Sequence, residues 1–275
     1  MWNNARFINF VANLLTVLAL SALAVGGLVW LMQRPVFTIA QVEVHPAEGE
    51  ALDRVTPTVV RNALIGRLEG NFFTADLESV RHFMEDAPWV SQAAVRRVWP
   101  NGLQVTLREH QPLGLWNDDQ VLDVNGRAFT ANQAEAESPD GDPLPILGGP
   151  EGSGKLVRQR LLELSEWVAP LGRSPVRLTL SPRHAWVAEL DNGMILDMGR
   201  DLANDPVLGG NAAEGRRAVP VQARVQRFVQ ALPAIEQHLG RPVMYADLRY
   251  PNGFALRLGP PLEPPKKKTS STTKP

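Results

Sequence analysis

The chain has 275 residues, of which 44% are hydrophobic and 21% are charged, and its formal net charge at pH 7 is −1. This composition is that of an ordinary globular protein, and the length allows roughly two domains. A net charge so close to zero gives no general electrostatic reason to bind nucleic acid. The sequence contains no cysteine, which excludes disulfides, thiolate chemistry and cysteine-ligated metals.

An apolar segment without a charged residue lies near the N-terminus, from 7 to 32. It is longer than the roughly 20 residues that a helix needs to cross a bilayer. A cleaved signal peptide is the alternative, since Ala22-Leu23-Ala24 resembles a processing site, but the apolar run is too long for a typical signal core. We therefore expect residues 1–6 to be a short tail and residues 7–32 to be a membrane-spanning helix, with the globular mass on its C-terminal side.

Residues 36–110 show the pattern of one small two-layer domain. Thr56-Pro57 has the cap and first-turn proline that begin a helix, and Gly70-Asn71 is expected to end it. A second helix fits residues 76–86, where apolar residues recur at helical spacing. Strands are predicted at 36–46, 90–98 and 103–109. The order β-α-α-β-β predicts two helices on one face of a three-stranded sheet.

Residues 111–259 are predicted to form a second, mixed α/β domain. A strand pair is expected within 114–132, where Asn125-Gly126 is a hairpin signal, and the Gly/Pro/acid-rich stretch that continues to residue 155 is expected to be mostly loop. Helices fit 156–168 and 221–239, and strands fit 176–180, 185–190 and 194–198. Residues 202–220 are interpreted as a flexible insertion, and residues 260–275 as a disordered tail.

A strand-turn-strand pattern ends the predicted fold, in "DLRYPNGFALRL", residues 247–258. Apolar residues alternate with polar ones in both arms, which is the period of half-buried strands. Pro251-Asn252-Gly253 is expected to make the turn, because asparagine and glycine tolerate the positive φ of a tight reversal. The sequence therefore predicts a terminal β-hairpin.

No group of residues in the sequence predicts catalysis or metal binding. The five histidines lack the short spacings of a metal site, and "GGPEGSGK" (residues 148–155) lacks the register of a phosphate-binding loop. No serine lies in a nucleophile-elbow pattern. We expect no cofactor, no small-molecule substrate and no enzymatic activity, which leaves recognition by surfaces and sheet edges.

The middle of the chain carries a resemblance to a known family. Residues 69–116 resemble the POTRA module of the FtsQ/DivIB family of bacterial cell-division proteins, through "GNFFTADLESVR", "PWV", "VRRVWP" and "REHQPLGLW". The similarity to the Gram-negative FtsQ branch extends through "NGMILDMGR" and "DLRYPNGFALRL" to residue 258. The segment before the helix at 221–239 is longer than this family pattern leads us to expect.

The resemblance implies an α+β protein of the bacterial inner membrane, with a cytoplasmic N-terminus, a POTRA domain at 36–110 and a β domain at 111–259 that contains an extended, mostly antiparallel sheet. Members of the family act as non-enzymatic scaffolds of the divisome at the septum. Their POTRA module is associated with recruitment by other division proteins, and their β domain binds FtsB within a complex with FtsL. The lipid bilayer would be a further partner.

The resemblance also implies a binding site for FtsB at the final sheet edge. An edge strand has unpaired N–H and C=O groups that can receive another strand. By motif match the expected contacts are Arg200, Arg249, Tyr250, Asn252, Gly253, Phe254 and Leu256. Leu256 is better explained as a core residue than as a contact, whereas Phe254 is equally well explained as a ring that covers the sheet. In the POTRA part, Trp89, Val95 and Trp99 are expected to be packing residues.

Two other functions fit parts of the sequence. A POTRA-bearing component of protein translocation or outer-membrane assembly is one alternative, although such chains usually add a long transmembrane β-barrel, whose many roughly ten-residue strands are not predicted here. A membrane-anchored cell-wall enzyme is the other, but no constellation indicates its catalytic residue.

Overall fold

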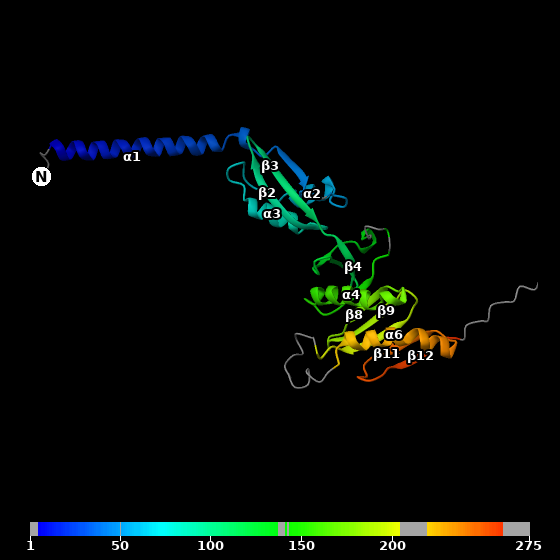
Figure 1. Ribbon diagram of the computed structural model, residues 1–275. Helices are drawn as coiled ribbons and strands as arrows, with labels where there is room; N and C mark the ends of the chain where they lie inside the picture. The colour runs from blue at the N-terminus through cyan, green and yellow to red at the C-terminus, as the bar shows by residue number, and fades with distance from the viewer. Residues whose placement is uncertain (1–4, 50, 137–140, 142, 204–218, 261–275) are drawn as a thin grey trace, which may run out of the picture. The chain divides into compact units, whose positions relative to one another are not determined.

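The computed structural model describes residues 5–49, 51–136, 141, 143–203 and 219–260. The chain divides into two compact units, Met1–His110 and Gln111–Pro275, called here the first and second unit. Figure 1 shows that both units combine helices with sheet, so the predicted α+β class is confirmed.

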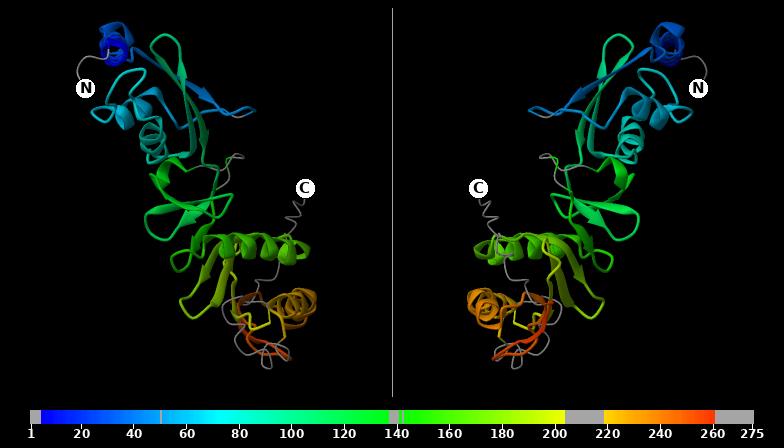
Figure 2. Two further views of the ribbon diagram at one scale, coloured as in Figure 1. Left: turned by 90° about the vertical axis from the view of Figure 1, so that its left-hand side faces the viewer. Right: turned by 90° about the vertical axis from the view of Figure 1, so that its right-hand side faces the viewer.

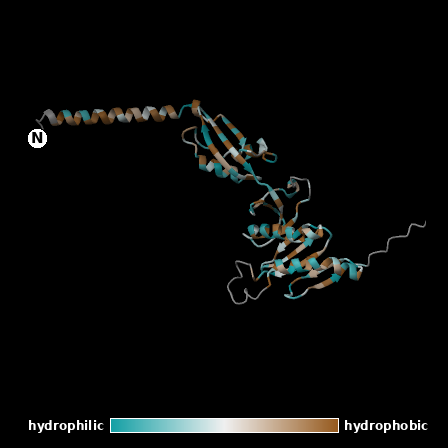
Figure 3. Ribbon diagram, in the orientation of Figure 1, coloured by the Kyte–Doolittle hydropathy of each residue, from teal (hydrophilic) through white to brown (hydrophobic). Residues whose placement is uncertain are grey.

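The first unit begins with the long helix α1, Ala5–Met32. At 1.5 Å per residue it is about 40 Å long, which exceeds the roughly 30 Å hydrocarbon core of a bilayer. Its side chains from Phe7 to Met32 are not buried by the rest of the protein, and Figure 3 shows that they are predominantly hydrophobic. Among the described residues, α1 is the one helix long and apolar enough to cross a membrane.

The rest of the first unit has the predicted order β-α-α-β-β. Its elements are β1 Gln41–Pro46, α2 Pro57–Leu64, α3 Leu77–Glu85, β2 Val90–Val98 and β3 Gly102–Glu109. The sheet order is β1-β3-β2, with β1 parallel and β2 antiparallel to the central β3. Both β1 and β2 are therefore edge strands of this small sheet.

Caps and apolar spacing explain the two short helices. The Thr56 side chain accepts a hydrogen bond from the Val59 N–H, and the Asp76 carboxylate accepts one from the Glu78 N–H, so each helix begins with a side-chain cap. Each helix buries two apolar side chains one turn apart, Val60 and Leu64 in α2 and Val80 and Met84 in α3. Alternate residues of β3, Leu103, Val105 and Leu107, are buried in the same core.

Three predictions for the first unit were wrong in detail. The strand expected from residue 36 begins only at Gln41, because Pro35–Phe37 form a 3₁₀ turn (η1). Helix α2 ends at Leu64 instead of continuing to Gly70-Asn71, since the backbone reverses at Gly66, whose φ is +72°. Trp89 is buried as expected, but Trp99 is 76% exposed and does not pack in the core.

The second unit is built on one nine-stranded sheet. Its strands are β4 Pro112–Trp116, β5 Gln120–Asp123, β6 Ala128–Thr130, β7 Ile146–Gly148, β8 Pro175–Leu180, β9 Ala185–Leu190, β10 Ile195–Arg200, β11 Val243–Asp247 and β12 Ala255–Leu258. Their order in the sheet is β12-β11-β10-β9-β8-β7-β4-β5-β6. The pairs β10–β11, β7–β8 and β4–β7 are parallel and the other five are antiparallel, so the sheet is mixed and mostly antiparallel.

Two helices, α4 Gly154–Val168 and α6 Val221–Leu239, pack side by side against this sheet (Figure 2). The core beneath them includes a row of residues in register across neighbouring strands: Leu178, Ala188, Leu196 and Ala246. All four are almost completely buried, and Leu256 of β12 continues the row with partial burial. The terminal hairpin is thus joined to the core through one face of the sheet.

The connection before α4 and the terminal hairpin differ from the predictions. Ile146–Gly148, expected to be loop, form β7, a strand of three residues between β4 and β8. The hairpin arms are shorter than predicted, since β11 ends at Asp247 and β12 begins at Ala255. The reversal between them spans seven residues and places neither Asn252 nor Gly253 at positive φ. Most of the predicted insertion at 202–220 and of the predicted tail lies outside the described residues.

Candidate functional site

Strand β12 is the outer strand at one end of the large sheet, and its backbone alternates between two directions. The Gly259 N–H donates to the Pro242 carbonyl at 2.8 Å, so it points back along the β11 side of the hairpin. Because strand backbones repeat every two residues, the N–H groups of Arg257 and Ala255 point the same way. Those of Leu256 and Leu258 point outward, together with their carbonyls.

Hydrogen bonding on the other side of β11 supports the same assignment. The Leu248 N–H donates to the Asp197 carbonyl of β10 at 2.8 Å, and by the two-residue period the Ala246 N–H also faces β10. Tyr245 and Asp247 then face β12, where their register partners are Arg257 and Ala255. The hairpin bonds therefore use Arg257 and Ala255, and the outward groups of β12 face no other strand among the described residues.

The side chains of β12 lie on two chemically different faces. Leu256 and Leu258 pack against the hydrophobic core, whereas Arg257 lies on the face opposite the helices. Its guanidinium carbon stands 5.0 Å from the ring centroid of Tyr245, within cation–π range. The Tyr245 hydroxyl in turn donates to Asp197 at 3.2 Å, and burial together with the nearby Asp197 carboxylate raises the pKa of Tyr245.

Arg249 is held just after β11 by two carboxylates. Its Nε and Nη2 donate to Asp247 at 2.8 and 2.6 Å, and its Nε lies 3.6 Å from an Asp197 oxygen. These hydrogen bonds from the guanidinium hold the pKa of Asp247 below its ordinary value. Asp247 is buried while Arg249 is more than half exposed, so the pair presents a fixed cation at the surface.

Gly199 allows Arg249 to pass close to β10. Its φ is +62°, in the left-handed region that favours glycine. A Cβ atom at this position would lie 2.7 Å from Cγ of Arg249. The glycine in "DMGR" thus makes room for the arginine that follows the hairpin's first strand.

Arg224 of α6 holds the backbone around this cluster through three hydrogen bonds. Arg224 Nη1 donates to the carbonyls of Met198 and Leu248 at 2.8 and 2.7 Å, and its Nη2 donates to the Arg200 carbonyl at 2.9 Å. Burial lowers the pKa of this guanidinium. One buried cation thus joins the end of β10 to the segment after β11, which brings Arg200 and Arg249 to the same part of the surface.

The reversal after Arg249 is tied to the same helix. Arg227 Nη1 donates to the Pro251 carbonyl at 2.6 Å, and the Phe254 ring packs edge-on against Phe228 at a centroid distance of 5.4 Å. Tyr250, the residue before Pro251, has 54% of its surface exposed. The reversal is therefore positioned by α6, although it belongs to no strand.

The structure separates the seven predicted contact residues into two groups. Exposed side chains belong to Arg200, Arg249, Tyr250 and Asn252. Gly253, Phe254 and Leu256 are partly buried, and the last two pack against the core. The side chains of Phe254 and Leu256 therefore stabilise the fold. The backbone N–H and C=O of Leu256 point outward at the sheet edge.

Sequence reasoning missed the residues that position this site. Asp197 lies within the motif "NGMILDMGR" but was not singled out there. Arg224 and Arg227 carry no motif, because spacing alone does not tell a buried arginine on an amphipathic helix from an exposed one. The only available signal is that Arg224 falls between the buried Val221 and Val225 on the apolar side of α6.

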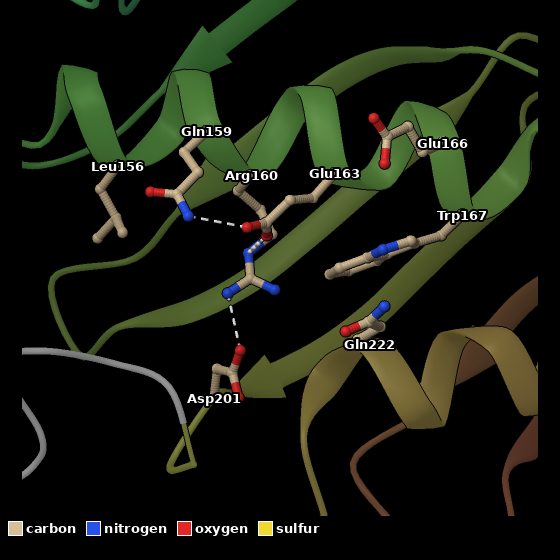
Figure 4. A pocket seen from close by; sticks show the side chains of 8 residues that line it. All are labelled: Leu156, Gln159, Arg160, Glu163, Glu166, Trp167, Asp201 and Gln222. Atoms are coloured by element: carbon tan, nitrogen blue, oxygen red, sulfur yellow. Dashed lines mark hydrogen bonds and ion pairs between the residues drawn. The ribbon is translucent and has the colours of Figure 1, made fainter.

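A polar hollow of about 600 Å³ opens between α4 and α6 (Figure 4). At its base Arg160 Nη2 donates to Asp201 at 2.7 Å, and Asp201 also accepts from the N–H of Val221, the first residue of α6. Gln159 donates to Glu163 at 2.9 Å, and Glu163 lies 3.5 Å from Arg160 Nε. These contacts form a buried ion pair and hold the first residue of α6 in place. The residues that line the hollow do not place a nucleophile beside a base.

The chemistry that these groups support is recognition. No group of three or more histidine and carboxylate side chains that would suit a metal ion occurs in the described part of the chain. The features brought together are an open sheet edge, a pair of surface arginines and an exposed tyrosine. Such an arrangement can bind an extended segment of another chain.

Comparisons with known proteins match both units. The model of "POTRA domain, FtsQ-type" matches residues 37–110, and that of "Cell division protein FtsQ/DivIB, C-terminal" matches residues 114–249. The chain is 48% identical to "Cell division protein FtsQ" of Bordetella pertussis, over 100% of this chain and 98% of that protein. It is 44% identical to the protein of the same name from Burkholderia pseudomallei, over 94% of each, and 33% identical to that of Nitrosospira multiformis, over 94% and 99%.

Proposed function

Since this chain belongs to the FtsQ/DivIB family of cell division proteins, we propose that it is a non-enzymatic scaffold of the divisome that binds FtsB on the outer edge of β12. In this proposal α1 crosses the inner membrane once, with the N-terminus in the cytoplasm and both folded units in the periplasm. FtsL joins the same complex, and the assembly links early division proteins to septal peptidoglycan synthesis.

The observation that carries the proposal is the outward direction of the Leu256 and Leu258 backbone groups on an edge strand. Two N–H and two C=O groups on alternate residues form the row to which an added strand bonds. Strand addition obtains its affinity from these main-chain bonds and its selectivity from neighbouring side chains.

The surface arginines would supply part of that selectivity. Arg200 is exposed at the end of β10, and its backbone is held by Arg224. Arg249 is fixed by Asp247 in one orientation, so little side-chain freedom would be lost on binding. We propose that acidic groups of FtsB approach Arg200. Tyr250 and Asn252 would contact the bound FtsB segment beside the edge, and Gly253, which has no side chain, would let the backbone of that segment come close.

The first unit would serve other partners. In this proposal residues 36–110 of this unit form the POTRA domain, which contributes, together with α1, to recruitment by other division proteins. Residues 111–259 would form the β domain that binds FtsB.

The test is a titration of the full-length chain in lipid nanodiscs with the periplasmic part of its cognate FtsB, followed by calorimetry. Arg200→Glu and Tyr250→Ala are expected to weaken binding, because each changes an exposed side chain beside the edge while leaving the core intact. The matched control is Arg173→Glu. Arg173 is a surface arginine paired with Asp191, which follows β9 at the end of the β9–β10 pair opposite to Arg200. Equal affinities for the wild type, Arg200→Glu and Tyr250→Ala would remove both residues from the site.

A further inference from the structure

Two chain reversals at one end of the first unit lie beside the segment that leaves α1. Strand β1 begins in register with Gly102, at the start of β3, and the Ala40 N–H donates to the Asn101 carbonyl at 3.0 Å. The turn between β2 and β3, residues 99–101, therefore lies next to the linker 33–40. Figure 1 shows this turn at the same end of the small sheet as η1.

The segment between α2 and α3 lies at that end as well. The Asn71 side chain donates to the carbonyl of Met32, the last residue of α1, at 2.9 Å. The Phe72 N–H donates to the Phe37 carbonyl at 2.9 Å, and the Phe37 and Phe73 rings meet edge-on at 4.9 Å. Residues 71–73 are thus joined directly to the end of α1 and to η1.

This end of the unit collects exposed apolar side chains. Val36 is 68% exposed, Phe73 40% and Trp99 76%. Among the described residues between 33 and 110, the one other large hydrophobic side chain that stands well exposed is that of Ile65, at the end of α2. Val36, Phe73 and Trp99 come from the linker, the α2–α3 segment and the β2–β3 turn, three places far apart in sequence. We call this set the apolar end.

Exposed apolar groups gathered on one end of a folded unit need a covering surface. Val36 lies only four residues beyond Met32, which limits its distance from the end of α1 to about 14 Å even in a fully extended chain. The bilayer around α1 is therefore within reach of the apolar end. Trp30, over which the Arg34 guanidinium stacks at 3.5 Å, is of the residue type that favours the membrane–water boundary.

We propose that the apolar end rests on the lipid headgroup region of the bilayer that α1 spans, with Trp99 inserted at the boundary. This inference rests on the proposed membrane span of α1, but not on the proposed binding of FtsB. Tryptophan suits the position because its ring is apolar while its indole N–H can bond to headgroups or water. The contact would give the first unit a second attachment to the membrane and so restrict its tilt.

The test uses the full-length chain reconstituted in phosphatidylcholine vesicles, with and without phosphatidylglycerol. Because the chain has no cysteine, Asn101→Cys gives a single site for an environment-sensitive fluorophore beside Trp99. Glu48→Cys is the matched control, since Glu48 is exposed in the turn that follows β1, at the other end of the sheet. Spin-labelled lipids then report contact of each fluorophore with the bilayer.

The proposal predicts strong quenching by spin-labelled lipid at residue 101 and none above background at residue 48. Trp99→Ser in the Asn101→Cys background is expected to abolish that quenching, and Trp99→Phe to retain part of it, while the circular dichroism of each variant stays that of the wild type. Equal quenching at residues 101 and 48, or quenching at residue 101 that survives Trp99→Ser, would overturn it. Flotation with the vesicles reports the span of α1 separately: a chain that floats but shows no quenching at residue 101 contradicts this inference alone.

Discussion

A pair of proline substitutions in β12 distinguishes its outward backbone groups from its hairpin groups. Proline removes the N–H at its own position. At Leu256 the lost N–H points away from β11, whereas at Arg257 it points into the hairpin opposite Tyr245. Both positions lie on the same edge strand, where proline is tolerated on the outward side. The two variants therefore differ mainly in which hydrogen bond they remove.

The expected stability changes differ accordingly. Arg257→Pro leaves the Tyr245 carbonyl without its hairpin donor and forces the ring against β11, at a cost of about 2–4 kcal/mol in the free energy of unfolding. Leu256→Pro loses no internal hydrogen bond and exchanges one half-buried apolar side chain for a smaller one, at a cost of about 1–2 kcal/mol. Urea unfolding followed by near-ultraviolet circular dichroism measures the order of the two midpoints.

Binding of FtsB is expected to show the separate effect of the outward group. Leu256→Pro removes a donor of the proposed added strand and puts a ring in its path, so the affinity should fall by about tenfold or more in a folded protein. A Leu256→Pro variant that unfolds as easily as Arg257→Pro would refute the assignment of outward groups. A folded Leu256→Pro variant with wild-type affinity would refute strand addition.

Three further substitutions test how the site is positioned. Arg224→Met should lower the free energy of unfolding by about 2–4 kcal/mol, because three backbone carbonyls, two of them buried, lose their donor, and a change below about 1 kcal/mol in chemical denaturation would contradict this role. Gly199→Ala should lower the free energy of unfolding by about 1–2 kcal/mol through its positive φ, and it should weaken FtsB binding by displacing Arg249. Unchanged stability in chemical denaturation and unchanged FtsB affinity in calorimetry would argue against the close approach. Asp247→Asn should be less stable than the wild type above about pH 5, with the difference shrinking below about pH 4: the folded pKa of Asp247 is depressed, so its stabilisation is complete above the unfolded pKa and is lost as the pH falls through the folded pKa. A difference between the two proteins that is independent of pH would exclude this ion pair as the cause.

Elements with strong local signals were predictable from the sequence. Thr56 caps α2 as predicted, and Asn125-Gly126 forms the turn between β5 and β6, with Gly126 at a φ of +75°. Strand β7 was missed because three residues between Pro145 and Gly149 are too short to show a period, and its place is set by pairing with β4 and β8. Such a short strand is stabilised by pairing with its neighbours, which the local sequence does not show.

The candidate site shows the same division. The family motif located Arg249 and Tyr250, but the arginines of α6 that hold their backbone lie more than 20 residues earlier in the chain and have no sequence pattern. The role of Phe254 also depends on a tertiary contact, because its ring packs against Phe228 and so serves the core. Trp99, expected to pack internally, is exposed because the β2–β3 turn projects beyond the small core. These outcomes depend on tertiary contacts that local periodicity does not encode.

Hydrogen exchange of the β12 amides with and without the periplasmic part of FtsB tests the central claim most directly. In the free protein the amides of Ala255 and Arg257 should be protected by the hairpin, while those of Leu256 and Leu258 should exchange faster. Saturation with FtsB should slow exchange at Leu256 and Leu258 by at least about tenfold, the factor that corresponds to about 1.4 kcal/mol. Binding that leaves both outward amides exchanging at their free rates would show that FtsB docks elsewhere and would contradict strand addition at this edge.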